Sequence, residues 1–325
     1  MDTNNLLIKT NIFQRLKIIK RIPKHILYSF LFLIFLTIFL HFLYWDTYYP
    51  EDLLNEDIFY AWKEGVNIEN GVNPYARILL GNLRDNSKYP TYLPLIYLFS
   101  AFLNKIGLNT FAEFLSIWRP ISLLADITIG TSIFYLYLRN GFFYLGLVSA
   151  TIVFLGRWSN YIVRVQHLEY LAIAFLILSL ILFEDKPFIS GVLMSGSLCV
   201  KHLAIIFLPI ILISAGLKIK NWHLSNFTIG LKKYLRGLII PVCILVTPFI
   251  LTSPLGFFSS LLFPISRHAG SSGLGTGIGS ILLGEDGAKI VAYILILYIY
   301  WISSKIKIPL FSSCLVSLFI FLQFN

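Results

Sequence analysis

Long apolar blocks separated by short polar breaks run along most of this chain. The blocks are about 13 to 21 residues long, and a helix crosses ~30 Å of hydrocarbon with about 20 apolar residues, or somewhat fewer inside a bundle. Because backbone polar groups in lipid must be satisfied within their own segment, the blocks are predicted to be helices. The pattern predicts an all-α, polytopic transmembrane helical bundle of about nine or ten spans. The predicted spans are about 26–45, 118–138, 141–156, 168–183, 188–200, 202–216, 237–252, 288–303 and 308–324.

The composition supports an integral membrane protein. Hydrophobic residues make up 57% of the 325 residues and charged residues only 13%, whereas a soluble domain carries about 25% charged residues. Many Tyr and Trp residues lie near block ends, as in the aromatic belts of membrane interfaces. The three cysteines lie far apart in apolar blocks and are predicted to be small buried residues without a disulfide or zinc pattern. They are Cys199, Cys243 and Cys314.

The positions of the basic residues predict an orientation. The net charge is +10, but basic loops mark the cytoplasmic side of membrane proteins, so nucleic-acid binding is not favoured. A basic arm at 1–25 and a basic loop at 217–236 are both predicted to be cytoplasmic. The run 26–45 is too long for a signal-peptide core, and no small-residue cleavage site follows it, so we expect it to be retained. The expected location is the plasma or inner membrane, or the ER membrane.

This orientation places four polar segments on the outer face: 46–92, 157–167, the Lys201–His202 break and 253–287. The first holds eight of the sixteen acidic residues, and long loops on a rigid scaffold often carry function. We expect it to contain short interfacial helices. The apolar block 93–107 breaks the alternation of inside and outside if it crosses fully, so it is predicted to be re-entrant or interfacial. We expect 1–325 to form a single transmembrane domain.

Several charged residues lie in or beside apolar blocks, where charge is costly and often marks a substrate or ion path. Lys201 interrupts a long apolar stretch; the alternative is a lysine at a helix end that extends its amine to the interface. Arg119 and Asp126 are seven residues apart, on one helix face, and are predicted to form a buried structural pair.

Carboxylates, Lys, Arg and His gathered under an outer loop indicate chemistry on a phosphate. The cations would hold the phosphate, and a carboxylate would accept a proton. An enzyme that faces outward has no nucleotide sugar or ATP at hand, so its phosphate substrate is expected to be carried by a lipid.

Three motifs stand out along the first outer loop: Asp57-Ile58-Phe59-Tyr60, Gly71 to Arg77, and Tyr92-Leu93-Pro94-Leu95. In this order they resemble the first outer loop of GT-C glycosyltransferases, which use polyprenyl-phosphate sugars. They resemble in particular the first mannosyltransferase of GPI-anchor synthesis and its bacterial and archaeal relatives. His167-Leu168-Glu169-Tyr170 is similar to a polar outer-loop motif of these enzymes, and Lys201, followed by an apolar run to Pro209, is similar to a family lysine. The chain departs from the pattern at Glu56-Asp57, which lacks a second Asp, and at Thr91-Tyr92, which interrupts Tyr-Pro-Pro.

The resemblance implies a hexosyltransferase that moves a mannose-like sugar from a polyprenyl-phosphate donor to a hydroxyl of a glycan, lipid or protein acceptor. Asp57 is the implied general base, with Glu56 and Asp46 as rivals. No cofactor or metal is required, although an Asp57–Glu169 pair offers an alternative metal site. The implied donor-phosphate ligands are Lys201, Arg267, His268 and Arg164, and the implied substrate-binding residues are Tyr75, Arg77, Tyr92, His167 and Glu169.

Other functions remain open at this point. A flippase or transporter of lipid-linked sugars is one, although paired halves or matching broken helices, which transporters often have, are not visible in the sequence. A polysaccharide polymerase or ligase is another, and would rely more on outer-loop arginines than on a carboxylate. A non-catalytic assembly subunit is the third. The glycine-rich run 273–279 lacks the βαβ context of a dinucleotide site and is expected to be a flexible outer loop.

Overall fold

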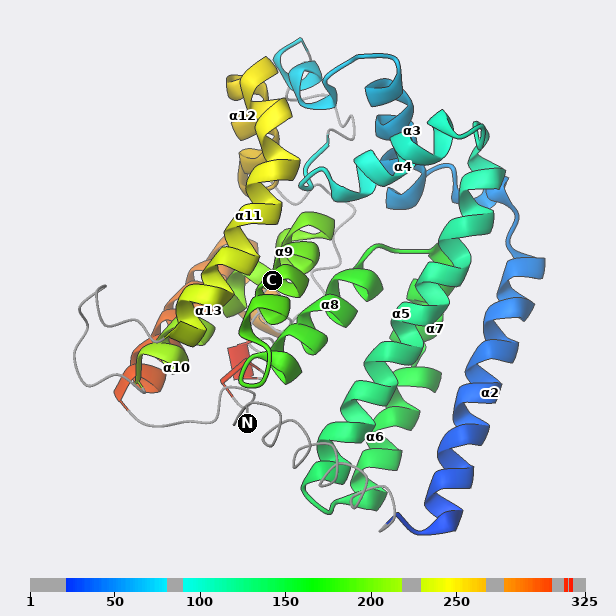
Figure 1. Ribbon diagram of the computed structural model, residues 1–325, viewed down its shortest axis with the longest axis vertical. Coiled ribbons are helices and arrows are strands. Elements are labelled where there is room, and N and C mark those ends of the chain that lie inside the picture. The colour runs from blue at the N-terminus through cyan, green and yellow to red at the C-terminus, as the bar shows by residue number, and fades with distance from the viewer. Residues whose placement is uncertain are drawn as a thin grey trace, which may run out of the picture. The chain divides into compact units, whose positions relative to one another are not determined.

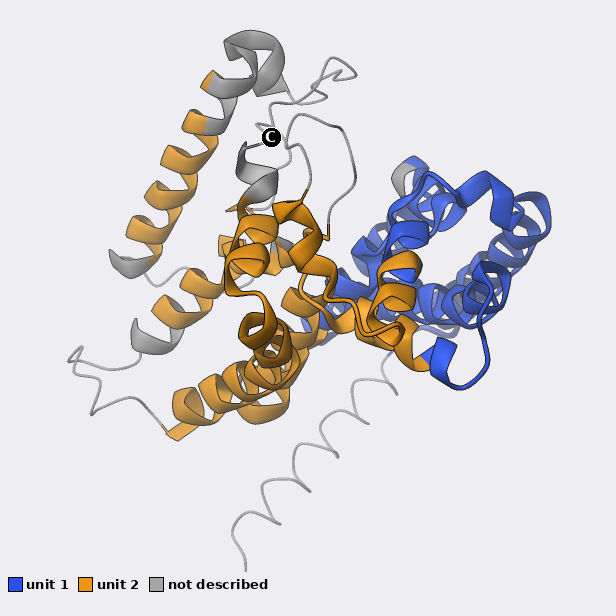
Figure 2. Ribbon diagram, turned by 90° about the horizontal axis from the view of Figure 1, so that it is seen from above, with its two compact units in different colours: residues 1–62, 103–177 blue, residues 63–102, 178–325 orange. Residues whose placement is uncertain are grey.

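The computed structural model describes residues 22–80, 90–217, 229–266 and 278–305, with the short pieces 313–314 and 316–317. All regular structure in these residues is helical (Figure 1), which confirms the all-α prediction for this part of the chain. The chain divides into two compact units (Figure 2), and a single domain over 1–325 stays a prediction. Unit 1 comprises 1–62 and 103–177, and unit 2 comprises 63–102 and 178–325.

Unit 1 is built around three apolar helices that pack side by side, α2, α5 and α6 (Figure 1). Its core joins Phe30 of α2, Phe134 of α5 and Phe154 of α6, and the rings of Phe30 and Phe134 stack at 3.9 Å. A Cβ atom on Gly130 would lie 2.2 Å from the Phe154 ring, so only glycine leaves room for this packing. The elements are α2 (Lys24–Thr47), η1 (Pro50–Leu53), the start of α3 (Asp57–Glu69), α5 (Phe111–Arg139), α6 (Phe143–Leu155), α7 (Arg157–Val165) and the first part of α8 (Glu169–Leu182).

Unit 2 contains the closest helix crossing among the glycine contacts described, between α9 and α11. A Cβ atom on Gly191 would lie 2.1 Å from the Tyr234 carbonyl oxygen, and one on Gly237 would lie 2.1 Å from the Phe188 carbonyl oxygen. The two backbones therefore touch through reciprocal glycines. Besides the rest of α3 and α8, unit 2 contains η2 (Pro74–Leu79), α4 (Leu95–Lys105), α9 (Pro187–Val200), η3 (His202–Phe207), α10 (Leu208–Leu217), α11 (Ile229–Thr252), α12 (Pro254–Ser266) and α13 (Ile278–Lys305).

Three helices, α2, α5 and α11, are long and apolar enough to cross a membrane. Apolar helices of 10–17 residues also lie at 95–105, 169–182, 187–200, 204–213 and 290–303. These helices indicate a lipid environment for the protein. The number of nine or ten spans, their orientation and the identity of the membrane stay predictions.

Most predicted spans coincide with helices, but the predicted breaks are less accurate. The segment 157–167 contains α7, and α11 begins at Ile229, so the basic residues Lys232, Lys233 and Arg236 belong to a helix and not to a loop. The segment 253–287 contains α12 and the first turns of α13. A search for apolar blocks misses these helices because their composition is mixed. Outside the described residues lie 218–228, 267–277 and most of 308–324.

Two further expectations concern short segments. The block 93–107 forms α4, which at 11 residues is shorter than the ~17 needed for a span. The segment 46–92 does contain short helices, namely η1, α3 and η2. Cys199 and Cys314 are buried as predicted, but Cys243 is exposed, because it lies on an outward face of α11.

Candidate functional site

A histidine surrounded by three carboxylates forms the clearest polar cluster in unit 1. His167 Nδ1 lies 3.1 Å from Glu169 Oε2 and 4.0 Å from Asp57 Oδ2. Its other ring nitrogen, Nε2, lies 3.7 Å from Glu56 Oε2. The four side chains are 20–29% exposed, so a ligand can reach them. The structure therefore brings together Glu56, Asp57, His167 and Glu169, which come from two separate segments of the sequence.

The ends of three helices position this cluster. Glu56 precedes α3 and Asp57 begins it, where the partial positive charge of a helix N-terminus favours a carboxylate. Helix α7 ends at Gln166 in the left-handed conformation (φ 55°, ψ 41°), and the Gln166 amide donates to the Val163 carbonyl at 2.6 Å. This turn places His167 between α7 and α8, and Glu169 lies in the first turn of α8.

A cation lies beside the same cluster in unit 1. The Arg164 guanidinium lies 5.4 Å from the ring centroids of both Tyr48 and Tyr161, and the Tyr161 ring lies 5.8 Å from that of His167. The cluster thus combines proton acceptors with a positive charge held by aromatic rings. The rival base Asp46 lies in the last turn of α2 and is exposed.

The predicted Arg119–Asp126 pair is wrong. Arg119 instead donates to the Tyr48 carbonyl oxygen at 2.5 Å, and Asp126 Oδ2 lies 3.8 Å from Nε2 of the buried His41. Spacing along one helix cannot reveal partners from another element, and here both partners come from α2 or the residue after it.

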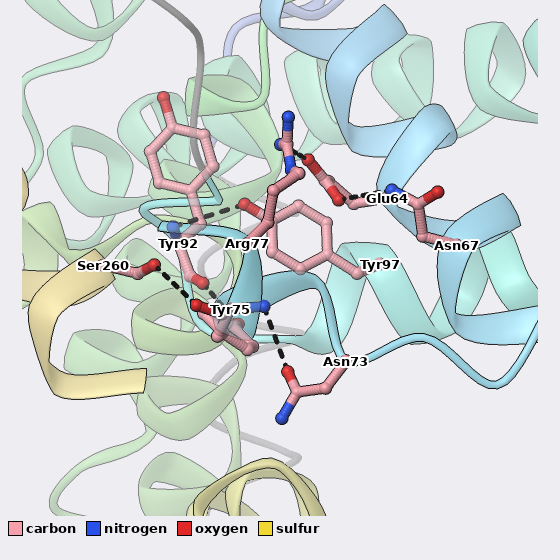
Figure 3. A network of polar contacts seen from close by, with 8 residues as sticks. All are labelled: Glu64, Asn67, Asn73, Tyr75, Arg77, Tyr92, Tyr97 and Ser260. Carbon is pink, nitrogen blue, oxygen red and sulfur yellow. Dashed lines mark hydrogen bonds and ion pairs between the residues drawn. The ribbon is translucent and has the colours of Figure 1, made fainter. Parts of the chain in front are cut away.

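In unit 2, Tyr75 and Tyr92 belong to a network of polar contacts (Figure 3). The Tyr75 hydroxyl donates to the Tyr92 carbonyl at 2.6 Å, and the Tyr92 N–H donates to the Tyr97 hydroxyl at 3.3 Å. Tyr75 is 0% exposed and packs on Phe249 and Phe257. Burial raises the pKa of its phenol well above the ordinary value, so it donates as a neutral group. The structure therefore gives Tyr75 a role in holding the fold.

Arg77 forms an ion pair with Glu64 in the same network (Figure 3). Glu64 is 3% exposed, whereas Arg77 is 39% exposed. Asn67 also donates to Glu64, at 2.9 Å. Burial raises the pKa of the Glu64 carboxyl, and the Arg77 charge offsets part of this rise. The structure thus gives Arg77 a partner within the protein.

Lys201 follows the last residue of α9, in extended backbone (φ −153°, ψ 129°). Its Nζ lies 5.3 Å from the centroid of the Tyr92 ring, and the ring of the adjacent His202 lies 6.0 Å from that of Tyr92. Lys201 and Tyr92 are both half-buried. Two residues predicted to bind the substrate from different motifs therefore meet in unit 2.

The remaining predicted phosphate ligands, Arg267 and His268, lie outside the described residues, as does most of the glycine-rich run 273–279. Within the ranges that the structure describes, no group of three or more His, Cys, Asp or Glu side chains is arranged to hold a metal ion.

Sequence reasoning missed several residues of these sites. Tyr48 and Tyr161, which hold Arg164, resemble ordinary interfacial aromatics, and nothing in the sequence distinguishes them. Glu64 was recognisable only as an acid in a polar loop. Asn73 was part of a motif. Its role as the N-cap of η2 could be predicted from the following Pro74, because proline is favoured in the first turn of a helix.

Comparison of the chain with protein-family models, curated proteins and solved structures finds no match.

Proposed function

We propose that this protein is a membrane glycosyltransferase that transfers a hexose, mannose-like, from a polyprenyl-phosphate sugar to a hydroxyl acceptor on the outer or lumenal face. The observation that carries the proposal is the contact of Asp57, Glu56 and Glu169 with His167. The motifs that resemble GT-C glycosyltransferases contribute three of these four residues. The chain would cross the bilayer several times, with its basic N-terminal arm in the cytoplasm.

The cluster suits the activation of an acceptor hydroxyl. A general base must be within hydrogen-bond reach of the proton that it removes, and Asp57 is 26% exposed. A histidine beside several carboxylates can donate a hydrogen bond from a ring N–H to one of them. Glu169, at 3.1 Å from His167 Nδ1, would fix the orientation of the ring. Glu56 is the alternative base in the same cluster.

The proposed reaction is a single displacement at the sugar C1 atom. The acceptor hydroxyl gives its proton to Asp57, and its oxygen forms the new bond to C1. The bond between C1 and the phosphate oxygen breaks, and polyprenyl phosphate leaves with the electron pair. Glycosyl transfer passes through a transition state that resembles an oxocarbenium ion, and a phosphate is a good leaving group without a general acid.

The leaving phosphate gains negative charge, which a cation can stabilise. Arg164 is the candidate in the same unit as the cluster. Lys201, Arg267 and His268 are the further candidates that the resemblance implies. A well-placed donor of this kind contributes about 3–4 kcal/mol to transition-state stabilisation. Stacking on Tyr48 and Tyr161 restricts the guanidinium of Arg164, which lowers the entropy lost on binding.

The test is turnover of a defined donor. The purified full chain is incubated with polyprenyl-phosphate mannose or polyprenyl-phosphate glucose, and released polyprenyl phosphate is measured. We expect Asp57→Asn to slow turnover at least about 100-fold, the usual contribution of a general base. Glu69→Gln is the matched control, because Glu69 lies on the same helix but is exposed at its far end.

Other outcomes identify other functions. Turnover of Asp57→Asn at the wild-type rate contradicts the base assignment, and the same assay on Glu56→Gln and Asp46→Asn then identifies the base. No turnover with either donor, combined with movement of the lipid-linked sugar across a vesicle bilayer, favours a flippase.

A labelling experiment tests the orientation. In a Cys243→Ser background, a cysteine at Tyr161, which is 39% exposed, is treated in sealed cells with a membrane-impermeant maleimide. We expect labelling from outside. Labelling only after the cells are opened places the cluster on the cytoplasmic side and contradicts the outward-facing enzyme.

A further inference from the structure

Helix α7 has two faces of opposite character. Ser159, Val163 and Gln166, spaced at i, i+4 and i+7, are 9%, 3% and 1% exposed. On the other side, Arg157 is exposed and Tyr161 is 39% exposed, and Arg164 completes a second i, i+4, i+7 series. Residues at this spacing lie on one helix face. The outer face of α7 is therefore Arg157, Tyr161 and Arg164, with two positive charges around one aromatic ring.

Among the described residues, neither arginine of this face makes an ion pair. Helix α7 contains no acidic residue. In the part of the chain that the structure describes, no ion pair joins Arg157 or Arg164 to a carboxylate. The guanidinium of Arg164 rests on the Tyr48 and Tyr161 rings, which orient it without cancelling its charge. The face is thus suited to an anion.

Two apolar stripes end beside this face. On α6, Leu145, Val148 and Ile152 are 50–65% exposed, and α6 ends at Leu155, two residues before Arg157. Such exposed apolar series are the surfaces that acyl chains cover in a membrane protein. On α2, Phe35, Phe39 and Phe42 are 55–63% exposed, and Tyr48 follows the end of α2.

Gly156 joins α6 to α7. It adopts an extended conformation (φ −64°, ψ 150°) between α6 and α7, and a Cβ atom there would lie 2.4 Å from the Ile152 carbonyl oxygen. A helix with Arg and Tyr on its polar face, directly after an apolar helix, is typical of the membrane interface.

We propose that the outer face of α7, formed by Arg157, Tyr161 and Arg164, binds the phosphate of an anionic phospholipid of the surrounding bilayer. Arginine pairs with phosphate through two parallel N–H···O bonds, and acyl chains would lie along the exposed stripe of α6. This role does not depend on the proposed transferase reaction, which uses Arg164 but not Arg157. A substitution of Arg157 therefore tests lipid binding without changing a residue of the proposed transferase reaction.

The test uses the purified full chain in a neutral detergent with a photoreactive phosphatidylglycerol. Labelled peptides are mapped by mass spectrometry, and unlabelled lipids compete for the site. We expect labelling on α7 that phosphatidylglycerol displaces and phosphatidylcholine does not. Arg157→Gln should weaken the competing affinity about fivefold, because each basic residue at a membrane surface contributes on that order. Arg157→Lys keeps the charge but not the two parallel bonds, so it should weaken the affinity less than Arg157→Gln does.

Arg139→Gln is the control, because Arg139 is an exposed arginine in the last turn of another unit 1 helix, α5; α7 labelling should be unchanged. The thermal midpoint of each variant confirms that it is folded. Equal displacement by phosphatidylcholine overturns the proposal, as does undiminished phosphatidylglycerol affinity in Arg157→Gln. Displacement by polyprenyl phosphate but not by phosphatidylglycerol also overturns it, and assigns the face to the donor.

Discussion

Replacing Arg77 with methionine removes the positive charge that faces the buried Glu64 carboxylate. Glu64 is 3% exposed and keeps the Asn67 amide as a donor, at 2.9 Å. Breaking a fully buried ion pair costs about 3–5 kcal/mol. Arg77 is 39% exposed, so water screens part of the attraction, and we expect a loss of about 1.5–3 kcal/mol in the free energy of unfolding near pH 7.5.

The loss should depend on pH. Burial raises the pKa of Glu64 above its ordinary value of 4.5, and the Arg77 charge lowers it in part, so Arg77→Met raises it further. At a pH between 4.5 and the raised pKa of the folded state, Glu64 holds a proton in the folded protein and releases it in the unfolded chain. The stability that this proton contributes is fully present below the unfolded pKa and is lost as pH rises through the folded pKa. The destabilisation by Arg77→Met should therefore be smaller at pH 5 than at pH 7.5.

Thermal unfolding in detergent at the two pH values measures this effect. We expect Arg77→Met to lower the midpoint by about 3–12 °C at pH 7.5, given about 2–4 °C per kcal/mol for a unit of this size. Adding Glu64→Gln should restore most of the loss, because a neutral amide needs no countercharge. Arg236→Met, at an exposed arginine of α11 in the same unit, should change little. An equal loss at both pH values, or additive effects in the double variant, refutes the reasoning.

Two other predictions test the packing of unit 2. Gly191→Ala should lower the free energy of unfolding by about 3 kcal/mol or more, because its Cβ would lie 2.1 Å from the Tyr234 carbonyl oxygen and overpacking costs at least about 1–3 kcal/mol. The control is Val192→Ala, at a residue that is 37% exposed on the same helix. Equal midpoints of the two variants in thermal unfolding would contradict the close crossing. Tyr75→Phe should cost about 1–2 kcal/mol by the same assay, because the Tyr92 carbonyl loses its donor, and an unchanged midpoint would mean that water replaces the hydroxyl.

The apolar pattern predicted where helices form better than where they end. The run 26–45 lies within α2 and 188–200 within α9, because in both cases an uninterrupted apolar sequence coincides with one helix. The start of α11 at Ile229 was missed, since Lys232 and Lys233 made its first turns resemble a loop. The basic residues of such a turn can point to water while the backbone remains helical, and a hydropathy pattern does not distinguish these cases.

The association of Asp57 with His167 and Glu169 was predicted only through the order of the motifs. Nothing in the spacing of residues 57 and 167 fixes their distance, which depends on how α7 and α8 meet at Gln166. A positive φ at a glutamine is uncommon, and no local sequence signal announces it. Contacts of this kind depend on tertiary packing and had to come from the structure.

The Gly-x-Asn-Pro-Tyr segment changes meaning once its contacts are known. The Asn73 side chain accepts from the Tyr75 N–H at 3.0 Å and donates to the Phe249 carbonyl at 3.1 Å. Pro74 begins η2, and Tyr75 is buried with its hydroxyl bonded to Tyr92. Each of these residues is therefore explained by folding, without any ligand.

The cluster around His167 differs in this respect. Glu56, Asp57 and Glu169 place three acids around one imidazole at 24–29% exposure. Like charges gathered at one place destabilise a folded protein, and such groups are concentrated at functional sites. A motif whose residues satisfy one another supports the fold, whereas one that gathers like charges within reach of a ligand calls for a functional explanation. Chemical tests should therefore start at Asp57, and substitutions in 71–77 should be read first as changes in stability.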